Sequence, residues 1–125
     1  MSYSMSTLLI RHLPDDCGEI DPARRRAAID EMFHEDAVYY DRSGAYRGRD
    51  EINRIACVIK AGHPEYQYRP IAPPEELGDC GRVRWVSGRP GHAPSYAGTD
   101  FIIFRDSRIA ALYRFFDKLP SALGH

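Results

Sequence analysis

The sequence predicts an α+β fold in which helices cover one face of a bent antiparallel sheet. Segments with helical spacing of apolar residues fill the first half of the chain, and four extended segments follow one another in the second half. Helices segregated from strands are typical of α+β folds, whereas parallel α/β folds alternate the two. The chain has 125 residues, the size of one ordinary domain, so we expect a single domain over residues 1–125.

Two helices are expected at the start of the chain. The first covers residues 6–13 and ends before Pro14. The second is predicted over residues 22–33, because Asp21 can cap its first turn and Pro22 has the backbone angle that a first helical residue requires.

A short strand and a third helix come next. Residues 36–41 are rich in β-branched and aromatic side chains and lead into a turn at Gly44, which indicates a strand. Beyond Gly48, apolar residues recur at helical spacing until the chain reaches Gly62. The buried stripe of this third helix is expected to consist of Ile52, Ile55, Ala56 and Ile59.

Four extended segments complete the chain and are expected to form an antiparallel meander. The last two are joined only by Asp106 and Ser107, which is typical of a hairpin. Large apolar side chains lie on both faces of these strands. One face can pack on the helices, and the apolar side chains left on the outer face predict a homodimer. A well-covered monomer is the alternative. The four segments are residues 66–71, 82–87, 96–105 and 108–117.

Composition and charge exclude several classes of function. Seventeen Lys and Arg against eighteen Asp and Glu argue against nucleic-acid or membrane binding through bulk charge. No segment approaches the roughly 20 apolar residues of a membrane span. The cysteines, Cys17, Cys57 and Cys80, are odd in number and widely spaced, which predicts reduced thiols and a cytoplasmic location. The histidines lack metal-ligand spacing, so neither a metal nor another cofactor is expected, and His12 and His125 are expected to be solvated.

Four segments carry a family pattern: MFHEDAVYYD at residues 32–41, YRGRDEI at 46–52, GTDFIIFRDSRI at 98–109 and FFD at 115–117. Together they resemble the nuclear transport factor 2-like superfamily, which holds ketosteroid isomerase, SnoaL-like polyketide cyclases and limonene epoxide hydrolase. The resemblance covers residues 20–117. It implies a cone-shaped roll whose strongly bent sheet wraps around helices and encloses an apolar pocket, and usually a dimer. Many chemistries occur on this fold, so function must be argued from the site.

The resemblance also implies two catalytic aspartates. In the ketosteroid isomerase pattern, a general-base Asp closes the first strand, and a hydrogen-bond-donating Asp stands four positions before a Phe in a later strand. Asp41 and Asp100 match these positions, with Phe104 as the phenylalanine. The pattern also has a tyrosine in the first helix, where this chain has Leu13 and Cys17.

The other candidate residues are expected to line the pocket. Tyr39 shares a strand face with Asp41 and could supply the missing hydroxyl group. Asp41 itself has a structural alternative, the capping of the turn at Ser43. Trp85 is expected in the core, with the pocket wall or the dimer face as alternatives. The predicted lining consists of Tyr39, Trp85, Phe104, Leu112, Arg114 and Phe116.

The protonation state of Asp100 distinguishes the candidate functions from one another. A neutral Asp100 could donate a hydrogen bond to an enolate while Asp41 moves the proton, which is cofactor-free isomerase or cyclase chemistry on a small apolar carbonyl compound. An Asp100 paired with Arg114 or Arg84 would be ionised, and an Asp-Arg-Asp cluster could activate water as in limonene epoxide hydrolase. A non-catalytic ligand-binding or dimerisation module is a further alternative, favoured by the missing tyrosine.

Overall fold

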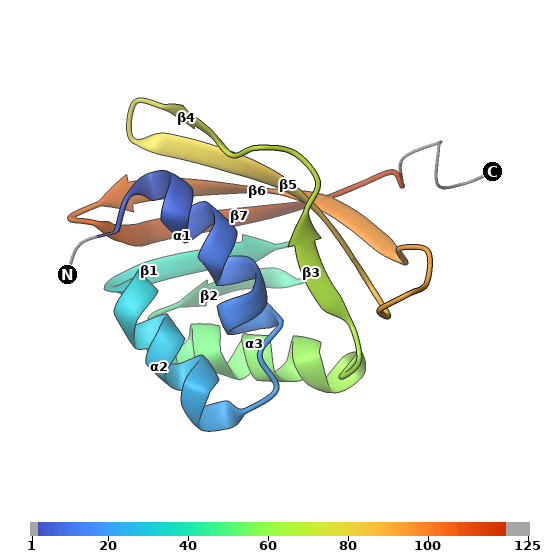
Figure 1. The fold of residues 1–125 in the computed structure, drawn as a ribbon. Helices are drawn as coiled ribbons and strands as arrows, with labels where there is room; N and C mark the ends of the chain where they lie inside the picture. The colour runs from blue at the N-terminus through green and yellow to red at the C-terminus, as the bar shows by residue number, and fades with distance from the viewer. Residues whose placement is uncertain (1–2, 120–125) are drawn as a thin grey trace.

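The computed structural model describes residues 3–119, apart from the side chains of residues 16 and 17. Within this part of the chain the helices are α1 (Met5–His12), α2 (Pro22–Met32) and α3 (Arg49–Gly62), and one π-helical turn, η1 (Leu13–Cys17), follows α1. The strands are β1 (Phe33–Asp41), β2 (Gly44–Arg47), β3 (Gln67–Pro70), β4 (Glu75–Leu77), β5 (Cys80–Gly88), β6 (Tyr96–Arg105) and β7 (Arg108–Asp117). The α+β fold predicted from the sequence is confirmed (Figure 1).

The strands form one curved sheet in the order β2-β1-β7-β6-β5-β3, and β4 also pairs with β5. β5, β6 and β7 form the expected antiparallel meander. β1, however, pairs with β7 in parallel, so the sheet is mixed. Such a pair requires a long connection, which α3 and the intervening strands provide. β2 and β4 lie outside the segments that the sequence predicted as strands.

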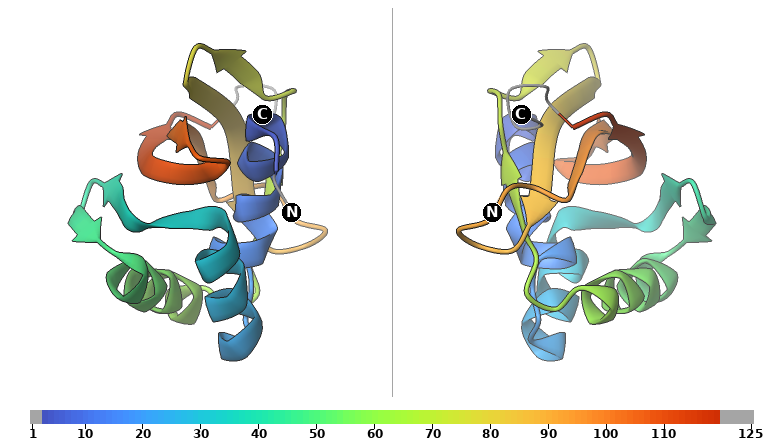
Figure 2. Two further views of the ribbon diagram at one scale, coloured as in Figure 1. Left: turned by 90° about the vertical axis from the view of Figure 1, so that its left-hand side faces the viewer. Right: turned by 90° about the vertical axis from the view of Figure 1, so that its right-hand side faces the viewer.

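The helices lie on the concave side of the sheet, which bends around them (Figures 1 and 2). α1 crosses the sheet closely at Gly81 of β5, where a Cβ atom would lie only 2.6 Å from Sδ of Met5 and 2.8 Å from Cδ1 of Leu9. No helix within the described residues is long and apolar enough to cross a membrane. The fully buried apolar residues between the layers include Leu8, Leu9, Leu13, Ile29, Met32, Ile102, Ile109 and Leu112.

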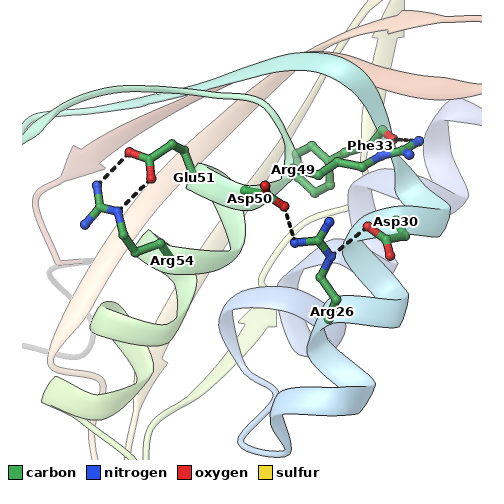
Figure 3. A network of polar contacts seen from close by, with 7 residues as sticks. All are labelled: Arg26, Asp30, Phe33, Arg49, Asp50, Glu51 and Arg54. Atoms are coloured by element: carbon green, nitrogen blue, oxygen red, sulfur yellow. Dashed lines mark hydrogen bonds and ion pairs between the residues drawn. The ribbon is translucent and has the colours of Figure 1, made fainter.

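Polar contacts fix the start of α3 against α2 and β1 (Figure 3). Arg26 of α2 donates hydrogen bonds to Asp30 at 2.9 Å and, across the helix pair, to Asp50 at 2.7 Å. Arg49 donates from Nε and Nη2 to the carbonyl oxygen of Phe33 at 3.0 and 2.8 Å. Exposed ion pairs of this kind contribute about 0–1 kcal/mol each, so they orient α3 more than they stabilise the fold.

Candidate functional site

Asp100 is the centre of a buried polar cluster on the concave face of the sheet. It lies in β6 between Val83 of β5 and Arg114 of β7, and its side chain is fully buried. Arg114 donates from Nε to Oδ1 and from Nη2 to Oδ2 of Asp100, both at 2.9 Å. The indole Nε1 of Trp85 donates to Oδ1, also at 2.9 Å. Both oxygens of the carboxylate therefore accept hydrogen bonds from the protein.

Gly98 determines the position of the Trp85 indole. The two residues are paired across β5 and β6, and a Cβ atom at position 98 would lie 2.3 Å from Cζ2 of Trp85. Any larger residue would displace the ring. The indole thus lies over the backbone of Gly98 and reaches Asp100, two residues further along β6.

His12 is a further member of this cluster, so the expectation that it is solvated is wrong. Its Nε2 lies 3.2 Å from Oδ2 of Asp100, and both side chains are fully buried. The family resemblance implies a first-helix tyrosine near Leu13, and the structure has an imidazole there instead, one residue earlier. The helical spacing of α1 was the available signal, because His12 continues the buried stripe of Leu8 and Leu9 at i+3 and i+4.

The surroundings of Asp100 keep its carboxyl group ionised. Burial by itself would raise the pKa of Asp100, but the charge of Arg114 and the hydrogen bonds from His12 and Arg114 outweigh it. The pKa of Asp100 is therefore held well below its usual range. An ionised carboxylate has no proton to donate. Of the two states that the sequence left open, the structure favours the pair with Arg114, and Arg84 is exposed.

Asp41, the second candidate aspartate, ends β1 and is half-buried. Its Oδ2 accepts a hydrogen bond from the hydroxyl group of Tyr39 at 2.9 Å, as expected from their common strand face. Its Oδ1 accepts from the backbone N–H of Ser43 at 2.8 Å and from Oγ of Ser43 at 2.5 Å. Asp41 therefore caps the turn after β1 and also contacts Tyr39.

Asp41 and Arg114 line one hollow of about 370 Å³ at the end of β1. Tyr40 lies opposite Tyr113 in the parallel pair, so the next residues, Asp41 and Arg114, fall in the same row of the sheet. Beyond that row β1 ends whereas β7 continues, and the hollow lies beside this continuing part of β7. It is an open surface hollow, and others of about 340 to 430 Å³ lie elsewhere on the described part of the chain, so the lining residues rather than the volume distinguish it. Its other walls are Tyr40, Arg42, Tyr113, Phe115 and Phe116.

The remaining predicted residues are divided between this region and the core. The Phe116 ring lines the hollow and meets the Trp85 ring edge to face at 5.8 Å. Tyr39 and Leu112 are buried and line a smaller apolar hollow of about 10 Å³ beside α3. Phe104 pairs with Ile109 near the β6–β7 hairpin, at the other end of β7 from Phe116. Phe104 therefore does not line the hollow with Asp41.

The described residues offer no cluster of three His, Cys, Asp or Glu side chains that could hold a metal ion. Cys57 and Cys80 are free thiols, exposed and half-buried respectively. The side chain of Cys17 and all of His125 lie outside the described part of the chain.

Comparisons with known proteins agree with this architecture. A family model described as the SnoaL-like domain matches residues 22–112. No curated protein sequence matches the chain.

Among solved structures, the chain is similar to a presumed isomerase of the SnoaL-like family from Agrobacterium tumefaciens, with 23% identity, a TM-score of 0.83 and coverage of 90% of this chain and 96% of that chain. A presumed polyketide cyclase from Sinorhizobium meliloti matches with 26% identity and a TM-score of 0.64, over 82% of this chain and 88% of that chain. A presumed ketosteroid isomerase from Kribbella flavida has 15% identity and a TM-score of 0.67, over 90% of this chain and 77% of that chain. These structural likenesses are evidence for the fold.

Proposed function

Because the chain belongs to the SnoaL-like domain family, as its sequence resemblance predicted, we propose that it is a cofactor-free enzyme. It moves a proton on a small apolar carbonyl compound, in an isomerisation or a cyclisation. The observation that carries this proposal is the hollow that Asp41 and Arg114 line together, with Arg114 held by Asp100. The free thiols of Cys57 and Cys80 support a cytoplasmic location.

Asp41 is the proposed base. Enolisation requires a base beside the acidic carbon and a donor beside the oxygen on which negative charge develops. A carbonyl compound bound in the hollow would lose its α-proton to the carboxylate of Asp41, and its oxygen would have to reach the guanidinium of Arg114, whose side chain is 1% exposed. In an isomerisation, Asp41 returns that proton to a different carbon. In a cyclisation, the enolate carbon instead attacks a second carbonyl carbon of the same molecule, the π bond of that carbonyl group breaks, and the resulting alkoxide takes the proton from Asp41.

Arg114 takes the donor function that the family pattern assigns to the second aspartate. Its guanidinium group is always charged and is fixed by two hydrogen bonds to Asp100. Asp100 in turn is held by Trp85 and His12. A buried ion pair costs several kcal/mol in desolvation and is weak evidence for stability. A cluster of four polar side chains in the core therefore favours a functional explanation.

Proton exchange with solvent tests the proposal even while the natural product of the reaction is unidentified. The protein is incubated in D₂O with a panel of cyclic ketones and β-keto esters, and loss of α-proton signals is followed by NMR. The proposal predicts exchange faster than in buffer for at least one compound. Binding of panel compounds without any exchange would favour the non-catalytic ligand-binding module.

Water activation on an epoxide is the second candidate function. The row that contains Asp41, Arg114 and Asp100 supports it, because two carboxylates would then flank one arginine. Such an enzyme would convert an epoxide to a diol that carries one oxygen atom from H₂¹⁸O. Label incorporation without α-proton exchange would select this function over the first.

We also propose that the chain forms a homodimer through the outer sheet face. Tyr113 and Phe115 are 37% and 56% exposed on this face. Tyr40 stacks on Tyr113 at 4.7 Å, and Phe101 meets Phe115 at 5.6 Å. Contiguous exposed aromatic side chains are typical of protein interfaces. Since Tyr40, Tyr113 and Phe115 also line the hollow, the partner copy would form part of the wall of the proposed active site.

A further inference from the structure

Arg42 places a cation at the rim of the hollow without an acidic partner among the described residues. It is exposed, in the turn after β1, and its Cζ lies 4.0 Å from the centre of the Phe116 ring. The neighbouring carboxylate of Asp41 is bound by Tyr39 and Ser43 instead.

The other arginine of the hollow has a different environment. Arg114 is buried, and its charge is balanced by Asp100 through two hydrogen bonds. Arg42 is thus the cation that an anionic ligand can reach from solvent. Its guanidinium can stack on Phe116 through its face and bind a carboxylate through its edge at the same time.

The walls of the hollow are suited to a planar ligand. The rings of Tyr40 and Tyr113 stack on each other at 4.7 Å with an interplanar angle of 5°, so each can offer a ligand only the face turned away from the other ring. Phe115 and Phe116 add two further aromatic surfaces. Aromatic side chains offer large apolar contacts to flat conjugated groups.

We propose that Arg42 binds the carboxylate of the substrate and thereby selects planar, conjugated carboxylic acids that also bear the reacting carbonyl group. The inference rests on the proposed function, because it takes the hollow as the active site. It places the anionic group of the substrate beside Phe116, and the acidic carbon between Asp41 and Arg114.

Binding of trans-cinnamate and of its neutral isostere trans-cinnamamide, followed by ¹H–¹⁵N NMR, tests the proposal. Wild-type protein is expected to bind cinnamate about tenfold more tightly, since a charge-assisted bidentate contact is the difference between the two compounds. The shifted amide signals should include those of Arg42 and Phe116. Arg42→Gln should remove the preference. Arg105→Gln, an exposed arginine at the far end of β6, should retain it.

Equal affinity for the two compounds would overturn the proposal, as would an unchanged preference in Arg42→Gln or shifts confined to another surface. These measurements do not depend on turnover. If Asp41→Asn lost proton exchange while Arg42→Gln kept the cinnamate preference, the proposed function would stand and the selection by Arg42 would be wrong. If Arg42→Gln lost the preference while wild-type protein exchanged no proton, the proposed function would be wrong.

Discussion

The Trp85 indole lies directly on Gly98 and points its N–H group at Asp100. A glycine without a side chain thus sets the orientation of a tryptophan, and the tryptophan sets one of the hydrogen bonds of the buried carboxylate. The geometry of the candidate site therefore depends on a residue that has no functional group of its own.

Gly98→Ala should destabilise the protein by about 1–3 kcal/mol, because the new methyl group would lie 2.3 Å from Cζ2 of Trp85 and 2.5 Å from the backbone oxygen of Phe115, and both must move. Gly62→Ala is the matched control, since nothing lies within 4 Å of a Cβ atom at Gly62. Urea unfolding followed by the fluorescence of Trp85, the only tryptophan, measures both variants. Equal stabilities for the two would show that the indole does not depend on Gly98.

Asp100→Asn should destabilise the protein by about 3–5 kcal/mol, because it leaves the guanidinium of Arg114 buried without its counter-charge. Asp100→Leu combined with Arg114→Met should recover most of that loss, since both members of the buried ion pair are then replaced by apolar side chains. Chemical unfolding of both variants measures the stability lost when Arg114 is left unpaired and the stability recovered when both charges are removed. A double variant as unstable as Asp100→Asn would contradict the electrostatic explanation.

The stability of the wild type should fall in acid because of Asp100. Its pKa is lower in the folded protein than in the unfolded chain, so its contribution is complete above about pH 4, near the unfolded pKa. The contribution is lost as the pH decreases toward the folded pKa. Urea midpoints between pH 2 and 7 should therefore decrease more steeply for the wild type than for the Asp100→Leu, Arg114→Met variant.

The proposed homodimer predicts twice the chain mass by light scattering at micromolar concentration. Phe115→Asp places a charge in the exposed aromatic face and should shift the protein to monomer without loss of helical circular dichroism. Leu77→Asp is a control, because Leu77 is also exposed but lies in β4 at the far edge of the sheet. A monomeric wild type would show that this face has no partner copy.

The elements of the fold were predictable where local patterns are strong. Helical spacing identified α2 and α3, and the short connection at Asp106 identified the β6–β7 hairpin. The parallel pairing of β1 with β7 was not predictable, because it depends on how distant segments meet. β2 and β4 have only four and three residues, too few for an alternation pattern to be recognised.

The candidate site was predictable only in part. The family pattern pointed to Asp41 and Asp100, whose catalytic roles stay predictions, and strand alternation placed Tyr39 on the same face as Asp41, to which it donates a hydrogen bond. Asp100 is neutral or ionised according to which side chain of the neighbouring strand lies opposite it. The register between β6 and β7 determines that side chain. His12 was missed because the apolar pattern of the first helix is weak, so its helical spacing from Leu8 and Leu9 was not recognised as part of a buried stripe.

Deuterium exchange by Asp41→Asn tests the central claim most directly. With the panel compound that exchanges fastest, Asp41→Asn should exchange at least about 100-fold more slowly than the wild type, the usual contribution of a general base. Asp36→Asn, an exposed residue of the same strand, should exchange at the wild-type rate. An Asp41→Asn variant that exchanges as fast as the wild type would contradict the proposal that Asp41 moves the proton.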